Sequence, residues 1–262
     1  MLQTTPYISR LFIYPIKSLD RVEIAKATIL PSGALKGDRE FAIFDSIDKF
    51  VNGKRHQKVH AIRSRFDLTN NTVTLKLPET ESRKFEIERE QNQIASYLSD
   101  YFGFPVHLQQ NTVMGFPDDT VSPGATVIST ATLEEIASWY PDLEVEEVRL
   151  RFRANIELSG VPAFWEDRLF TTPEDTFNFK IGNVHFEGVN PCQRCVVVTR
   201  NSQTGEADPQ FQKTFITKRR ETLPEWTERS RFNHFYRLAI NTRVPASETG
   251  KTIAVGDRLT LV

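Results

Sequence analysis

Cysteine and long hydrophobic runs are the two features that this sequence has least of. The 262 residues include only two cysteines, too few for the disulfide framework of a small secreted protein, so we expect a reducing, cytoplasmic location. No stretch approaches the roughly 18 consecutive apolar residues of a transmembrane helix, and the N-terminus has no basic segment followed by an apolar run. The sequence therefore predicts a cytoplasmic protein with no signal peptide and no membrane partner.

The charges of the chain nearly cancel. It has 33 lysine and arginine residues against 34 aspartate and glutamate residues, so its composition offers no excess of positive charge to a polyanion. We therefore expect no nucleic-acid partner. A hydrophobic content of 39%, with 11% aromatic residues, is sufficient for a real core. The length of 262 residues suggests one large domain or two smaller ones.

Short apolar segments predict a mainly β, barrel-like fold with a few short helices. Apolar stripes at helical spacing predict helices over residues 94–102 and 133–140, the second beginning with a capping box of Thr132 and Glu135. A loop rich in Pro, Gly and Asp at 111–124 is the best candidate for a domain boundary or an active-site loop. A boundary there gives domains at 1–110 and 111–262. Strands are expected near residues 7–15, 22–30, 41–44, 106–109, 126–128, 156–158, 237–242 and 253–261, with hairpins around Asn70-Asn71 and Gly182-Asn183.

Both cysteines lie in one short segment, residues 190–199. Cys192 and Cys195 are three residues apart with Arg194 between them, and the β-branched run 195–199 predicts a buried strand that begins at Cys195. Thiolate is the sulfur form that attacks or binds metal, and a neighbouring cation favours it. Half of a zinc site, a thioredoxin-like redox pair and two inert buried cysteines are alternative interpretations. No second cysteine pair and no following helix support the first two, but the spacing alone leaves all of them open.

Four other short stretches place cations or hydroxyl groups at the ends of predicted elements. They are residues 14–18, 33–39 and 151–155, together with Arg194. Lysine and arginine combined with serine and asparagine can bind phosphate and the edges of heteroaromatic rings. Each stretch taken singly is also compatible with ordinary solvated surface charge.

Together these segments resemble the signatures of one family. Residues 14–18 (Tyr-Pro-Ile-Lys-Ser) and 37–39 (Gly-Asp-Arg) are similar to the two signatures of the MOSC N-terminal β-barrel domain. Residues 151–156 (Arg-Phe-Arg-Ala-Asn-Ile) and 192–195 (Cys-Gln-Arg-Cys) are similar to the two signatures of the MOSC domain. This order resembles the mitochondrial amidoxime-reducing component and its bacterial relatives. The resemblance implies an N-terminal β-barrel domain, 1–110, packed on a MOSC β-barrel domain, 111–262.

The resemblance also implies a site for the molybdenum cofactor, molybdenum bound to molybdopterin. In the family the second cysteine of the Cys-x-Arg-Cys segment ligates the metal, which makes Cys195 the metal ligand and leaves Cys192 without that role. The family's acidic residue before a Ser-Pro pair corresponds to Asp118 or Asp119, and we take Asp119, with Cys195, as catalytic. The positions that match the family's cofactor-binding residues are Lys17, Ser18, Arg39, Arg153, Asn155, Gln193 and Arg194.

The function that the resemblance implies is reduction of a small N-hydroxylated substrate by oxygen-atom transfer. Two cysteines are too few for an iron–sulfur cluster, which generally needs four ligands. We therefore expect a separate electron donor of the ferredoxin or flavoprotein type. Two alternatives remain: sulfur transfer through a persulfide on Cys195, as the MOSC domains of cofactor sulfurases suggest, and a non-catalytic carrier of the molybdenum cofactor.

Overall fold

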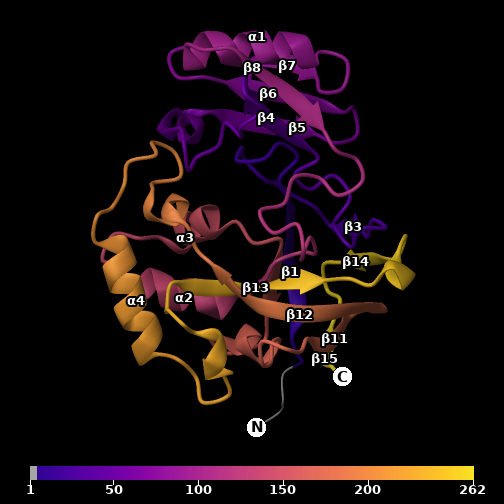
Figure 1. Cartoon of the computed structure of the whole chain (residues 1–262), viewed down its shortest axis with the longest axis vertical. Helices are drawn as coiled ribbons and strands as arrows, with labels where there is room; N and C mark the ends of the chain where they lie inside the picture. Colours follow the sequence, from indigo (N-terminus) through magenta and orange to yellow (C-terminus); the bar gives the residue numbers. More distant parts are fainter. Residues whose placement is uncertain (1–4) are drawn as a thin grey trace.

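Strands dominate residues 5–262, the part of the chain that the computed structural model describes (Figure 1). The main sheet contains β1 (Tyr7–Ile13), β2 (Val22–Glu23), β9 (Val127–Ser129), β10 (Ile156–Ser159), β11 (Phe177–Ile181), β12 (Val184–Gln193), β13 (Arg237–Arg243) and β15 (Leu259–Leu261). Its eight strands follow the order β15-β11-β12-β13-β9-β10-β1-β2. The prediction of a mainly β fold is confirmed.

Smaller sheets complete the β structure. They are built from β3 (Lys26–Thr28) with β14 (Thr252–Ala254), from β4 (Phe41–Asp45) with β8 (Val106–Gln110), and from β5 (Arg63–Asp67), β6 (Thr72–Lys76) and β7 (Arg83–Glu86). Figure 1 shows β4 to β8 in the upper part of the molecule, separate from the main sheet in the lower part. The hairpin around Asn70-Asn71 forms as predicted, because β5 pairs with β6 in an antiparallel register.

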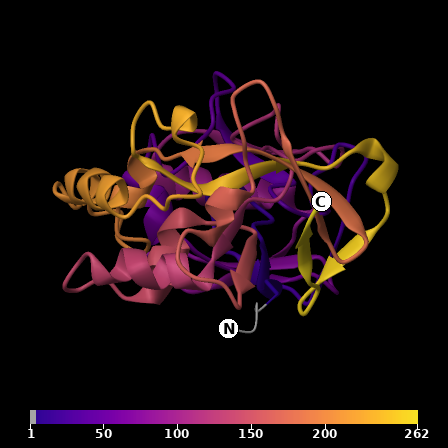
Figure 2. The same ribbon diagram turned by 90° about the horizontal axis from the view of Figure 1, so that it is seen from below.

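Four helices and several short turns connect the strands of residues 5–262. The helices are α1 (Gln91–Phe102), α2 (Thr130–Ser138), α3 (Val145–Phe152) and α4 (Phe211–Glu221), and the 3-10 turns are η1 (Gln57–Ala61), η2 (Trp165–Arg168), η3 (Val196–Thr199), η4 (Arg229–Arg231) and η5 (Ala246–Glu248). Helix α1 buries the predicted apolar stripe and ends at Gly103, whose φ of 82° is the left-handed conformation that glycine adopts readily. Figures 1 and 2 both place α4 on one side of the molecule, opposite to the C-terminal strands β14 and β15. None of the described helices has the length and apolar character needed to cross a bilayer.

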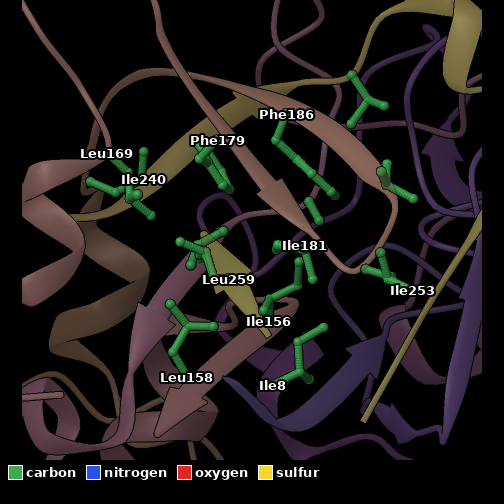
Figure 3. Close-up of a cluster of buried hydrophobic side chains, with 14 of the residues drawn as sticks. Ile8, Ile156, Leu158, Leu169, Phe179, Ile181, Phe186, Ile240, Ile253 and Leu259 are labelled. Carbon is green, nitrogen blue, oxygen red and sulfur yellow. The ribbon is translucent and has the colours of Figure 1, made fainter. Parts of the chain in front are cut away.

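The hydrophobic side chains form separate cores. One core lies in the main sheet, where Ile8 from β1 meets Ile156, Phe179 and Leu259 from other strands (Figure 3). A second core gathers apolar residues between 16 and 108 beneath α1, and a third packs α2, α3 and α4 against the main sheet. Strand β1 thus packs with the second half of the chain, whereas the segment after it builds a core of its own.

The pairing of the main sheet brings distant loops to one edge. Antiparallel β1 and β10 pair Leu11 with Ile156, so the end of β1 lies beside the start of β10. Parallel β9 and β10 pair Val127 with Ile156, which adds the start of β9 to the same edge. Ile240 of β13 pairs with both Val127 and Pro191 of β12. The loops at 14–18, 118–126, 153–155 and 190–195 therefore meet, although they are far apart in the sequence.

The strand that was predicted from Cys195 to Thr199 is wrong. Residues 196–199 form the 3-10 turn η3, with the Val198 amide donating to the Cys195 carbonyl at 3.4 Å. The valine-rich composition favours a strand, but a strand also needs a partner. The last residue of β12, Gln193, is already paired with Arg237, the first residue of β13. The Arg194 amide still bonds to the Tyr236 carbonyl at 3.0 Å, and the residues after it bond locally in η3. Cys195 therefore follows the end of a strand instead of starting one.

Three further predictions need correction. Residues 22–30 form two short strands, β2 and β3, because the amide of Ile24 still bonds to Leu11 of β1 whereas Ala27 pairs with β14. Residues 253–261 likewise divide into β14 and β15 around the turn at Gly256. The capping box is also wrong: α2 begins at Thr130, and the hydroxyl of Ser129 accepts from the Thr132 amide as its N-cap.

Candidate functional site

One large cavity lies at the sheet edge where the loops meet. Its volume is about 590 Å³, which is within the size range of small-molecule and cofactor pockets. Every residue proposed for the site from the sequence lines it: Lys17, Ser18, Arg39, Asp118, Asp119, Arg153, Asn155, Gln193, Arg194 and Cys195. The structure thus brings together residues from five separate segments, and their individual roles stay predictions.

The two cysteines occupy different environments. Cys195 is exposed in the cavity wall, whereas Cys192 is buried at 5% exposure. The Cys192 thiol donates to Oδ1 of Asn241 at 2.6 Å. Burial raises the pKa of Cys192 to about 11, with Arg194 opposing the shift, so Cys192 stays a protonated thiol at neutral pH. Both cysteines line the cavity, and Cys195 is the exposed one of the two.

Asn241 links Cys192 to the acidic loop of the cavity. Its Nδ2 donates to Oδ2 of Asp119 at 3.4 Å and to Oδ1 of Asn190 at 3.1 Å. The other carboxylate oxygen of Asp119 accepts from the amides of Val121 and Ser122, both at 3.0 Å. These bonds fix the Asp119 carboxylate in the cavity wall, on the same side as the cysteine segment.

Lys17 and Asp118 form an ion pair across the cavity. Nζ of Lys17 donates to Oδ1 of Asp118 at 2.5 Å and to the Phe116 carbonyl at 2.9 Å. The ammonium also lies 5.1 Å from the centre of the Phe50 ring. Burial lowers the pKa of Lys17, and the Asp118 charge counteracts that shift. Asp118 is therefore paired with Lys17, whereas Asp119 accepts a hydrogen bond from Asn241, the residue that also contacts Cys192.

Arg39 and Arg153 both pack against the ring of one buried tyrosine. The guanidinium carbons lie 5.0 Å and 4.1 Å from the centre of the Tyr14 ring. Arg39 also pairs with Asp38, and Nη2 of Arg153 donates to the Leu19 carbonyl at 2.7 Å. Both side chains are thus held rigidly before any ligand arrives, which is the pre-organisation that binding of an anion requires.

Three of the predicted residues adopt a strained backbone conformation. The φ angles of Ser18, Arg39 and Arg153 are 72°, 50° and 54°, in the left-handed region that non-glycine residues rarely occupy. Each such residue costs on the order of 1–3 kcal/mol, and such residues cluster at active sites and ligand clamps. Their convergence on one cavity supports its assignment as the functional site.

Of the remaining predicted residues, Arg194 and Gln193 lie in the cavity wall, and Asn155 connects the strands beneath it. Arg194 bonds to the Phe152 carbonyl and lies 5.0 Å from the centre of that ring, and Gln193 ends β12. Asn155 is 1% exposed. Its amide accepts from Thr126 and donates to the Phe12 carbonyl at 3.1 Å, so it ties the strands β1, β9 and β10 together at the base of the cavity.

Several cavity residues were not predicted from the sequence, among them two on one strand. Arg237 and Asn241 both lie on β13 and line the cavity. They flank the apolar run 238–240, and the available signal was the pair of polar residues at its two ends. Nε of Arg237 is buried and has no hydrogen-bond partner within residues 5–262.

The protein offers one sulfur ligand at this site. Within residues 5–262 there is no group of three histidine, cysteine, aspartate or glutamate side chains that could hold a metal ion. A metal held at Cys195 would have to bring most of its ligands with it. The molybdenum cofactor fits this requirement, because its pterin supplies sulfur ligands. The cationic wall, including the unpaired donor of Arg237, suits the phosphate of the pterin.

Comparisons with known proteins match the two halves of the chain to two domain models. The model of the MOSC N-terminal beta barrel domain matches residues 5–104, and that of the MOSC domain matches residues 120–260. Molybdenum cofactor sulfurase from Homo sapiens is 24% identical over 82% of this chain and 29% of its own length. The enzyme of the same name from Caenorhabditis elegans is 27% identical over 78% of this chain and 30% of its own length.

The chain spans about 30% of the length of these curated relatives. A solved structure, the YUAD protein from Bacillus subtilis, aligns over 97% of this chain and 94% of that chain. Its identity is 12% and its TM-score is 0.39, too low to define a shared fold. The match to the MOSC domain alone covers more than half of the sequence, so the resemblance inferred from the motifs is confirmed. The chain belongs to the MOSC-domain family, with the MOSC N-terminal β-barrel domain preceding the MOSC domain.

Proposed function

We propose that this protein is a molybdenum-cofactor-dependent reductase of small N-hydroxylated compounds. One observation carries the proposal: a single cavity joins the exposed thiol of Cys195, a fixed carboxylate at Asp119 and a wall of lysine and arginine side chains. A soft sulfur ligand, an anion-binding wall and an acid–base group are the parts that such an enzyme needs.

The residues of the chain divide the work of binding. Cys195 would ligate the metal, while Lys17, Arg39, Arg153 and Arg194 would hold the anionic pterin. When bound, the cofactor would supply a redox-active metal centre for oxygen-atom transfer and for the exchange of two electrons. The protein orients that group through side chains that already have fixed positions.

Asp119 is the group best placed to hold or pass a proton. Its Oδ2 is bonded to Asn241 and its Oδ1 to two backbone amides, so the carboxylate stays fixed in the cavity wall. In the overall reaction the N–OH group gains two electrons and two protons, its N–O bond breaks, an N–H bond forms and water leaves. The electrons would come from a separate ferredoxin- or flavoprotein-type donor, since two cysteines cannot hold an iron–sulfur cluster.

A turnover assay tests this function. Protein purified from a host that makes molybdenum cofactor is supplied with an N-hydroxylated amidine, and formation of the amidine is followed. A chemical reductant should support turnover, whereas NADH alone should give none. Turnover with NADH alone would contradict the external donor, and absence of turnover in molybdenum-loaded protein with any reductant would contradict the reductase function.

Sulfur transfer is the second candidate, and the curated relatives favour it. They carry the name molybdenum cofactor sulfurase, and an exposed Cys195 in a cationic cavity could carry a persulfide to a metal–sulfur centre. This function predicts that mass spectrometry of the purified protein finds one additional sulfur atom on Cys195. Bound pterin without turnover or persulfide would instead indicate a cofactor carrier.

A further inference from the structure

A pair of side-chain amides from the main sheet lines the large cavity. Asn190 of β12 and Asn241 of β13 are direct cross-strand partners, and both belong to the cavity wall. Directly opposed residues of an antiparallel pair place their side chains on the same face of the sheet. Nδ2 of Asn241 donates to Oδ1 of Asn190 at 3.1 Å, so the two amides form one hydrogen-bonded unit.

Two neighbours fix the orientation of the Asn241 amide. The Asp119 carboxylate can only accept a hydrogen bond, so the atom of Asn241 that faces it is the donor Nδ2. On the opposite side the Cys192 thiol donates to Oδ1 at 2.6 Å. Burial raises the pKa of Cys192 to about 11, which keeps this thiol protonated and able to donate. Both contacts therefore require the same orientation.

The orientation of Asn241 in turn determines that of Asn190. Because Oδ1 of Asn190 accepts from Asn241, its Nδ2 is directed away from that contact. This Nδ2 donates no hydrogen bond within residues 5–262, and unlike Nε of Arg237 it is not shielded from solvent. Asn190 is half-buried and lines the cavity, so its free donor is available to a ligand bound there.

The surroundings of this donor favour a neutral ligand. Nδ2 of Asn241 contacts both Asp119 and Asn190, so a carboxylate lies next to the free amide. An anionic group bound at the amide would face that carboxylate, and two like charges side by side are unfavourable. A neutral group with an oxygen acceptor has no such penalty.

Asp119 offers an acceptor beside the Asn190 donor. Its Oδ1 accepts from two backbone amides and its Oδ2 from Asn241. A carboxylate has about four acceptor sites, which leaves one at Oδ2. An N-hydroxyamidine presents the complementary pair, because its hydroxyl oxygen accepts and its amino group donates. Such a molecule can bond to both side chains at once.

We propose that Asn190 is a substrate-binding residue, whose Nδ2 donates to the hydroxyl oxygen of an N-hydroxyamidine while Asp119 accepts from the amino group. The identity of the substrate rests on the proposed reductase function, whereas the free donor and its neighbouring acceptor are features of the cavity itself. The pair selects compounds with an N–H group next to the oxygen over tertiary amine N-oxides, which have no donor for Asp119.

Titration calorimetry of molybdenum-loaded protein without reductant tests the site, because no turnover occurs under these conditions. The probes are benzamidoxime, an N-hydroxyamidine, and benzamidine, which lacks the hydroxyl oxygen. We expect Asn190→Leu to weaken benzamidoxime binding about three- to tenfold, as loss of one hydrogen bond does, and to leave benzamidine binding unchanged. Asn178→Leu is the matched control, since Asn178 is exposed on β11 and does not line the cavity.

Equal affinities of wild type and Asn190→Leu for benzamidoxime would overturn the proposal. An equal loss for benzamidine would overturn it too, because the variant would then have damaged the cavity in general. Asn190→Leu should also retain the molybdenum and pterin content of wild type, and a loss of either would assign the amide to the cofactor instead.

A parallel turnover assay keeps this proposal separate from the proposed function. Benzamidoxime binding that depends on Asn190 but gives no turnover would support the site and contradict the reductase. Turnover in a protein whose affinity for benzamidoxime does not depend on Asn190 would support the reductase and overturn the site.

Discussion

Replacing each cysteine by alanine separates a structural sulfur from a functional one. Cys192 is buried and its thiol donates to Asn241 at 2.6 Å, so Cys192→Ala leaves the Asn241 carbonyl oxygen without its donor. An unsatisfied buried acceptor costs about 1–3 kcal/mol. We expect the lower part of that range, because Asn241 is only half-buried and water can reach it. Cys195 is exposed, so Cys195→Ala should change the free energy of unfolding by less than about 0.5 kcal/mol.

Thermal unfolding of the cofactor-free protein measures this difference. For a chain of this size a loss of 1 kcal/mol lowers Tm by about 2–4 °C, so Cys192→Ala should lower Tm by at least about 2 °C and Cys195→Ala should leave it nearly unchanged. Cys192→Ser keeps a donor for Asn241 and should recover part of the loss. In the folded wild type, a thiol reagent should modify Cys195 and spare Cys192. Equal stability losses in the two alanine variants, or fast modification of Cys192, would refute the division of roles.

Three further predictions concern buried charges. Burial and the neighbouring Asp167 raise the pKa of Glu166 to about 7. Because the folded protein holds the Glu166 proton more tightly than the unfolded chain, the protonated carboxyl adds roughly 1–3 kcal/mol to the free energy of unfolding. This contribution should be complete below the usual pKa of glutamate and should be lost as the pH rises through 7. Urea unfolding of Glu166→Gln should show a flatter pH dependence than wild type, and parallel curves would contradict this. Arg219→Met should cost about 3–5 kcal/mol in urea unfolding, because Asp167 loses its partner at 2.5 Å; a cost below about 1 kcal/mol would contradict it. Lys17→Met frees Asp118 and should reduce the pterin that copurifies, measured by fluorescence; unchanged pterin would exclude a binding role for Lys17.

Local signals in the sequence were sufficient for most of the elements. The Gly182-Asn183 pair marks the hairpin of β11 and β12, and the apolar stripe with Gly103 defines α1. The strand predicted from the β-branched run at 195–199 was wrong, because strand formation depends on a pairing partner that local composition does not describe. Helices α3 and α4 were missed, since their apolar faces are short and interrupted by many charged residues.

The candidate site was predictable only in part. The motifs identified residues from four segments, but their convergence depends on strand pairing, such as the contact of Leu11 with Ile156. Arg237 and Asn241 carry no motif and are recognised only because β13 places them in the cavity wall.

The metal and pterin content of cysteine variants tests directly whether Cys195 is the molybdenum ligand. Wild type, Cys195→Ser and Cys192→Ser are produced in a host that makes molybdenum cofactor, and molybdenum is measured by elemental analysis and pterin by fluorescence after oxidation. We expect about one molybdenum and one pterin per chain in wild type and in Cys192→Ser, and loss of molybdenum in Cys195→Ser. Equal loss in both variants, or loss only in Cys192→Ser, would contradict the assignment of Cys195 as the metal ligand.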